Sequence, residues 1–209
     1  MSTRSSIDVA RLPTSAFDTR APVWWGNTLL LLIESMTVAL LVASYFYLAR
    51  HFSPFPPPRV DHDPPLFEPL PRLLASSVDL VAHVASAGAM LLADRAARRA
   101  EGRTVRLALL AAVLIGLVSL ALRPAEMRGL HFGWDDNAYG SLVWGLLVLH
   151  TLYLVVAVAE ALFAAVSIAL YGLDEKLAVD ATLTSAYWYW VSAVWLVVYL
   201  VVWWTPRIL

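Results

Sequence analysis

Cysteine is absent from this sequence, and charged residues are scarce. Without cysteine the chain cannot form disulfides, iron–sulfur clusters, thiolate-bound zinc or copper sites, or a covalent haem attachment. Charged residues make up 15% of the chain, against about 25% in soluble proteins. The net charge of -1 gives no basic surface for nucleic acid, so we expect no nucleic-acid partner.

Hydrophobic residues, in contrast, make up 60% of the 209 residues, and the mean hydropathy is +0.67. Each of five continuous apolar runs is long enough to cross a bilayer as a helix, for which about 17–25 residues suffice. These runs predict an all-α integral membrane bundle of five transmembrane helices, because a barrel would show shorter, alternating segments. The predicted spans are residues 24–48, 70–93, 105–122, 138–171 and 183–204.

The distribution of Lys and Arg predicts the orientation of the bundle. Five arginines lie between Arg95 and Arg106, in the connection between the second and third spans, and three more lie in the N-terminal segment. The positive-inside rule therefore places the N-terminus in the cytoplasm and the C-terminus outside. We divide the chain into a cytoplasmic tail, residues 1–23, and a membrane domain, residues 24–209. Arg123 and Arg128 are assigned to the outer connection after the third span.

The predicted outer connection, residues 53–71, holds eight of the twelve prolines. Proline has no backbone N–H and disrupts helices, so this segment is expected to form a stiff, turn-rich or polyproline-like strap. It could be a plain linker, which we favour, or a docking segment for a partner.

Ionisable residues within the spans are costly to insert, at least about 2.5 kcal/mol each, and are therefore candidate functional residues. Counting along the helices predicts that Glu34, His83 and His150 lie in the inner half of the membrane. Glu160 is predicted to lie near the cytoplasmic boundary. We expect Glu34 to be uncharged or hydrogen-bonded against a neighbouring helix. The candidate proton, lipid or buried polar sites are Glu34, Asp79, His83, His150 and Glu160.

Two of these residues, Asp79 and His83, are four apart and share one helix face, so a carboxylate–imidazole contact is expected. Such a pair more often stabilises a bundle than performs chemistry. His83 and His150 could in principle ligate one haem, but no other feature of the sequence indicates a haem site. The residues contain no phosphate loop, nucleophile elbow or metal motif. The residues alone therefore favour a non-catalytic subunit. A membrane protein that handles protons is the second interpretation.

Three segments resemble subunit III of the haem-copper oxidases, the cytochrome c and quinol oxidases, in its five-helix bacterial form. They are WWGNTLLLLIESMTVALLVASYFYLAR with Glu34, WDDNAYGSLVWGLLVLH with His150, and YWYWVSAVW. The chain differs from the family pattern at four positions, where polar family residues are replaced by Leu74, Tyr153, Tyr189 and Ser192.

The resemblance implies a non-catalytic subunit of a proton-pumping terminal oxidase in aerobic respiration, located in the bacterial plasma (inner) membrane. It would hold no haem or copper itself, since these belong to partner subunits. It would contact subunit I directly, accompany subunit II and small subunits, bind phospholipid in a cleft between its helices, and support proton uptake. Two alternatives are an accessory protein of a nitric oxide reductase and a small membrane transporter.

Overall fold

The computed structural model describes residues 22–57 and 70–209, which form helices and no strand. All five long helices are long and apolar enough to cross a membrane, the last one counted to Ile208. The prediction of an all-α bundle of five spans is therefore confirmed. The elements in chain order are α1 (Pro22–Ala49), α2 (Leu73–Arg98), α3 (Gly102–Arg128), α4 (Ala138–Tyr171), α5 (Glu175–Tyr199), the π-helical turn η2 (Leu200–Trp204) and α6 (Thr205–Ile208).

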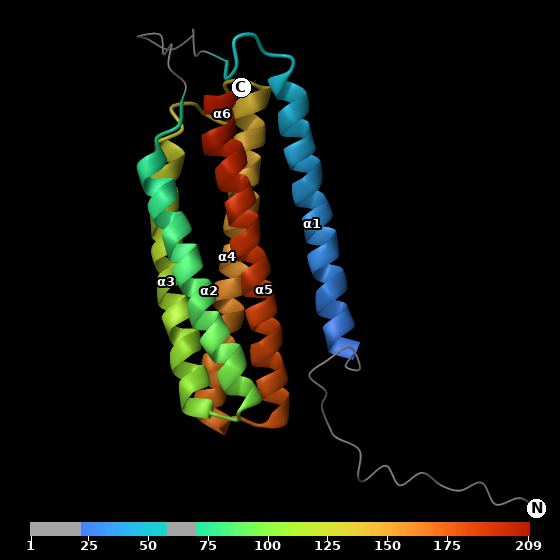
Figure 1. Ribbon diagram of the computed structural model, residues 1–209, viewed down its shortest axis with the longest axis vertical. Coiled ribbons are helices and arrows are strands. Elements are labelled where there is room, and N and C mark those ends of the chain that lie inside the picture. Colours follow the sequence, from blue (N-terminus) through green and yellow to red (C-terminus); the bar gives the residue numbers. More distant parts are fainter. Residues whose placement is uncertain (1–21, 58–69) are drawn as a thin grey trace, which may run out of the picture.

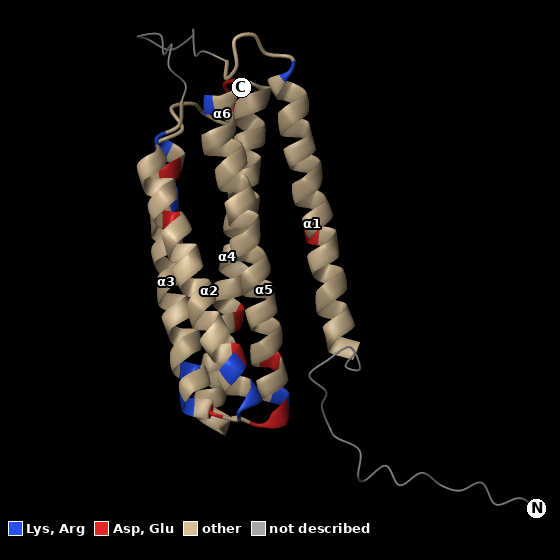
Figure 2. Ribbon diagram, viewed as in Figure 1, with Lys and Arg blue, Asp and Glu red and all other residues tan. Residues whose placement is uncertain are grey.

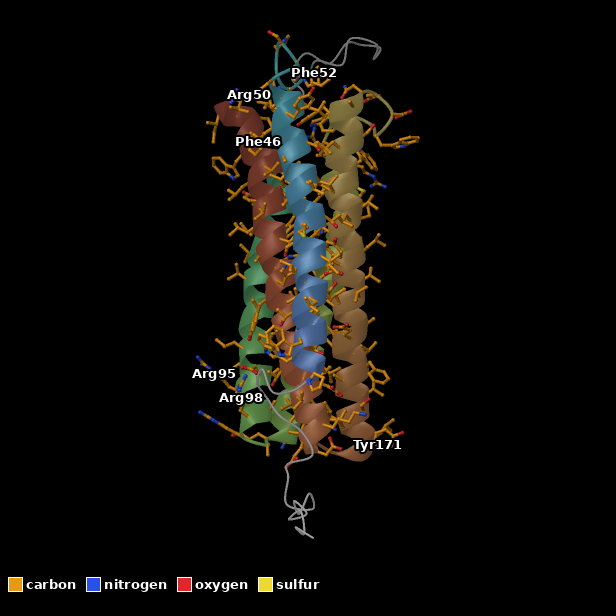
Figure 3. The ribbon with its side chains drawn as sticks, turned by 90° about the vertical axis from the view of Figure 1, so that its right-hand side faces the viewer. Phe46, Arg50, Phe52, Arg95, Arg98 and Tyr171 are labelled. Carbon is orange, nitrogen blue, oxygen red and sulfur yellow. The ribbon has the colours of Figure 1, made fainter. Side chains whose placement is uncertain are left out.

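Four helices, α2 to α5, form a tight up-and-down bundle, and α1 lies beside it (Figure 1). α1 packs mainly against α4 and α5, whereas α2 and α3 pack on the far side of the bundle. In the most apolar 18-residue stretch of α1, 11% of the residues are buried. In the corresponding stretch of the span from Glu175 to Ile208, 56% are buried. The face of α1 that points away from α4 and α5 is thus open to lipid or to a partner, as the view from that side shows (Figure 3).

Small residues let the helices of the bundle approach closely. Gly116 of α3 faces Val158 of α4 and Trp188 of α5, and an added Cβ would lie 2.7 Å from the Val158 Cγ2 atom. The Trp188 indole N–H donates to the Ser86 hydroxyl of α2 at 2.9 Å. This contact satisfies a buried polar group and joins α5 to α2 at the same level.

Side-chain caps begin α4 and α5. The side-chain amide oxygen of Asn137 accepts a hydrogen bond from the Gly140 N–H at 2.8 Å. The Asp174 carboxylate accepts one from the Leu177 N–H at 2.7 Å. Such caps satisfy N–H groups that have no partner within the helix. The quoted Asn-Ala-Tyr-Gly-Ser motif is therefore the start of α4, where the Ser141 hydroxyl also donates to the Trp134 carbonyl at 2.6 Å.

An aromatic cluster closes the end of the bundle at which α1 ends and α4 begins. Tyr45, Phe55, Phe132 and Tyr139 contact one another, with ring centroids 5.2–5.9 Å apart. Residues 53–57 thus fold onto the helix ends. Most of the proline-rich segment predicted as a strap, and nearly all of the predicted N-terminal tail, lie outside the described residues.

The third span is longer than predicted, because α3 continues through Pro124 to Arg128. The predicted span ended at residue 122, where the continuous apolar run stops at Arg123. Membrane helices tolerate proline where neighbouring groups satisfy the freed backbone. Arg123 consequently lies inside the bundle, with 3% of its surface exposed, and not in an outer connection.

Charged residues lie toward both ends of the bundle, as the coloured ribbon shows (Figure 2). Many of them surround the α2–α3 and α4–α5 turns, the end that the arginine count places in the cytoplasm. The opposite end carries Arg50 (Figure 3). Two polar sites lie between these ends, one enclosed by α2, α3 and α4 and one beside α1.

Candidate functional site

The first polar site is a buried group of five ionisable residues, which we call the polar cluster. Its exposed fractions range from 0% to 3%, so it is closed to solvent and lipid. Three helices supply the five residues, which are Asp79 and His83 of α2, Arg123 and Glu126 of α3, and His150 of α4.

The Arg123 guanidinium is the centre of the polar cluster. Its Nη1 atom lies 2.7 Å from the Glu126 Oε2 atom, and its Nη2 atom lies 3.5 Å from the Asp79 Oδ2 atom. Nη2 also lies 3.1 Å from the His150 Nδ1 atom. The guanidinium carbon stands 4.2 Å from the ring centroid of Trp195 on α5, a cation–π contact. One arginine therefore links four helices.

The expected Asp79–His83 pair is present within this cluster. The His83 Nδ1 atom is 3.5 Å from the Asp79 Oδ1 atom and 3.1 Å from the Asp79 backbone oxygen. The two histidine rings also meet, with centroids 5.3 Å apart, and both contact Trp195. The His150 Nε2 atom lies 3.2 Å from the Val191 carbonyl oxygen, so both of its ring nitrogens have protein partners.

The polar cluster lies nearer the end of the bundle that the orientation prediction places outside, and the predicted inner-half position of the two histidines stays a prediction. His83 is about 15 Å from the start of α2 and about 22 Å from its end, and His150 is about 18 Å from the start of α4 and about 32 Å from its end.

The second polar site surrounds Glu34 of α1, which is half-buried against α5. Its carboxyl group faces the Tyr187 hydroxyl and lies near Tyr153 of α4. The next residue, Ser35, accepts a hydrogen bond of 2.7 Å from the Trp190 indole N–H. Glu34 therefore points toward the bundle and has a polar neighbour, as expected from the cost of a lipid-facing carboxylate.

A groove lies on the side of Glu34 that faces the end with the α4–α5 turn. We call it the carboxylate groove, because Glu160 of α4 and Asp180 of α5 line it opposite Asn27 of α1. Its volume is about 400 Å³. Glu160 is exposed and interacts electrostatically with Glu34, so the two acidic groups belong to one site.

A second groove continues on the other side of Glu34, between α1 and α5. Its volume is about 500 Å³, and its lining is almost entirely apolar. We call it the apolar groove. Small residues shape its α1 wall, and the complete lining is Ser35, Val38, Ala39, Val42, Ala43, Trp190, Ala193, Val194 and Val197.

In the part of the chain that the structure describes, no three His, Asp or Glu side chains converge in a way that could hold a metal ion. Arg123 and Glu126 are the site residues that sequence reasoning missed. The signal that could have found them is their spacing of three residues, which places an arginine and a glutamate on one face of a continued helix. Asp79, His83 and His150 come together, whereas Glu160 lines the carboxylate groove and Glu34 lies beside it.

The family model of cytochrome c oxidase subunit III matches residues 17–206. The chain belongs to the cytochrome c oxidase subunit III family. The match spans all five long helices and confirms the resemblance suggested by the three segments. The chain is therefore a multi-pass membrane protein with a subunit III role in a multi-subunit oxidase.

Proposed function

We propose that this chain is the non-catalytic subunit III of a proton-pumping haem-copper terminal oxidase in a bacterial inner membrane. In this role it stabilises subunit I, binds phospholipid and supports proton uptake. The family match carries the proposal, because it covers all the helices that build both polar sites. Haem and copper belong to the partner subunits.

The carboxylate groove supports the part of the proposal that concerns protons. Glu160 is exposed and Asp180 is half-buried in the groove at the predicted cytoplasmic end, where carboxylates can capture protons from solution. Tyr187, Tyr153 and Glu34 continue this series of polar groups toward the middle of the membrane. Oxidases of this class take up protons from the cytoplasmic side, so a groove at the predicted cytoplasmic end supports such a role.

The apolar groove supports the part of the proposal that concerns lipid. Its length follows α1 and α5, and its walls offer only hydrocarbon and small side chains to an occupant. An acyl chain suits these walls, because burying each of its CH₂ groups contributes about 0.8 kcal/mol. A bound lipid would fill the apolar groove between α1 and α5.

Exchange of Glu34 tests the proposal in the assembled oxidase. We expect Glu34→Gln to leave assembly intact but to lower sustained turnover or hasten inactivation, because Gln cannot bind and release a proton. Met36→Leu is the matched control, since Met36 lies on the exposed face of the same helix. Turnover, inactivation rate and subunit content of the purified complex are measured together.

Two results would contradict the proposal. If the tagged full chain, purified in mild detergent, brought no haem-containing polypeptide with it, the subunit role would lose its support. If the co-purified partner held an iron B centre in place of copper B, the partner would be a nitric oxide reductase. Unchanged turnover and durability in Glu34→Gln would limit Glu34 to packing.

A further inference from the structure

A further pocket lies at the end of the bundle opposite the α4–α5 turn, away from both polar sites. We call it the outer pocket, because the orientation prediction places this end outside. The last turn of α1, residues 52–55 and Leu209 after α6 line it, and its volume is about 680 Å³. Figure 3 shows Phe46 and Arg50 on the side of α1 next to α5 and α6. The outer pocket therefore lies between the end of α1 and the end of α6.

Arg50 gives the outer pocket a positive charge that the described residues do not compensate. No other described lining residue has a charged side chain. Arg50 is exposed, and its guanidinium forms no ion pair with another described residue, Leu209 included. The guanidinium of Arg207, at the same end, instead donates to the backbone oxygens of Trp203 and Pro71. The donors of Arg50 are therefore available to an anionic ligand.

Contacts with the bundle hold the wall of the outer pocket in place. The Phe52 N–H donates to the Leu48 carbonyl oxygen at 3.3 Å, which continues the last turn of α1. The Phe55 ring packs against Tyr45 and Tyr139, with ring centroids 5.9 and 5.3 Å apart. Both tyrosines are buried, so the chain after α1 is fixed to the bundle. Binding in the pocket thus does not require the ordering of a loose segment, which would weaken it.

The outer pocket continues the apolar groove along α1. Phe46 of the pocket and Ala43 of the groove are three residues apart and share one helix face. Measured along the helix from Ala49, the last residue of α1, the groove extends from about 9 Å at Ala43 to about 21 Å at Ser35. The hydrocarbon layer of one leaflet is about 15 Å thick, half of the core of the bilayer. An acyl chain whose headgroup lies at Arg50 would therefore end within the groove.

We propose that the outer pocket binds the headgroup of an anionic phospholipid, with the phosphate at Arg50 and an acyl chain in the apolar groove. This inference rests on the lipid role in the proposed function and adds the charge of the headgroup and the leaflet, which is the outer one by the predicted orientation. Arginine donates charge-assisted hydrogen bonds to phosphate, and Phe46 and Phe52 offer apolar surface beside it. A zwitterionic lipid brings a cation of its own, which Arg50 repels.

The test measures the affinity of the full chain for two lipids. The tagged chain is purified in mild detergent and titrated with phosphatidylglycerol, which is anionic, or phosphatidylcholine, which is zwitterionic, and native mass spectrometry counts the bound lipids. We expect phosphatidylglycerol to bind about fivefold more tightly, the preference expected from one arginine and one net headgroup charge. Arg50→Gln abolishes this preference, whereas Arg50→Lys keeps the charge and retains most of it.

Matched controls separate the headgroup from the acyl chain. Arg128→Gln removes an exposed arginine at the same end of the bundle but outside the pocket lining, and it leaves the preference unchanged. Ala43→Phe fills the apolar groove and weakens the binding of both lipids, whereas Leu40→Phe, on the exposed face of α1, weakens neither. Inorganic phosphate at the concentration of the lipid does not displace phosphatidylglycerol, because it has no acyl chain.

Several outcomes would overturn the proposal. A preference that survives Arg50→Gln would remove the headgroup assignment, while weaker binding in Ala43→Phe would still support the lipid role of the groove. If the original chain bound neither lipid, the lipid part of the proposed function would fail as well. Displacement by phosphate alone would make the pocket a site for free anions. Loss of subunit I from an oxidase with Arg50→Gln, at an unchanged lipid preference, would make the pocket a protein contact instead.

Discussion

The polar cluster and the carboxylate groove both place acidic groups at membrane depth, but they solve the problem of buried charge differently. In the cluster, helix packing closes off five ionisable residues, and an arginine compensates the acids. In the groove, Glu160 stays exposed and Asp180 is half-buried, so water can compensate them. A closed site of this kind suits structural linkage between helices, whereas an open one suits exchange of protons with the aqueous phase.

The largest expected effect is that of breaking the cluster at its cation. Arg123→Met leaves the carboxyl groups without a counterion in a closed site, and we expect it to lower the free energy of unfolding by about 3–5 kcal/mol. Arg98→Gln is the control, because the Arg98–Asp94 pair is half-exposed and its loss costs about 0–1 kcal/mol. Unfolding in mixed micelles measures both. Equal stability of the two variants would show that the cluster does not depend on Arg123.

A smaller effect is expected from the packing that closes the bundle around the cluster. In Gly116→Ala the new Cβ would lie 2.7 Å from the Val158 side chain and 2.9 Å from the Trp188 side chain, so a side chain or a helix must shift. We expect a loss of about 1–3 kcal/mol, typical of overpacked interiors. Gly88→Ala and Gly145→Ala are controls, since no atom lies within 4 Å of their added Cβ. A neutral Gly116→Ala would mean that α3 can move without cost.

The smallest effect on stability is expected at the open groove. The double change Glu160→Gln with Asp180→Asn removes two groups that water can reach, so the free energy of unfolding should change by no more than about 0.5 kcal/mol. Proton uptake by the assembled oxidase should fall, because both surface proton acceptors are gone. Stopped-flow uptake with a pH dye measures this, with Asp94→Asn as control. A large loss of stability without a change in proton uptake would show that the carboxylate groove is structural and takes no part in proton exchange.

Most of the architecture could be predicted from local signals. Run length and the lack of charge predict each span, and the side-chain cap Asn137 stands directly before the fourth apolar run. Asp174 caps α5 nine residues before the predicted fifth run begins at residue 183. The Asp79–His83 contact follows from a spacing of four on one helix. The inward direction of Glu34 follows from the cost of an anion in lipid.

The sequence by itself determined what depends on near neighbours, because a membrane helix satisfies its backbone hydrogen bonds within its own segment. Membership of the subunit III family likewise follows from motifs that can be read along the chain. Only the tertiary structure decided that Arg123 lies inside the bundle, although Pro124 follows it. Its partner Asp79 is on another helix, and whether the two meet depends on how α2 and α3 rotate and pack against each other. That rotation is set by contacts across the whole bundle, such as Gly116 against Trp188, and no local pattern encodes it.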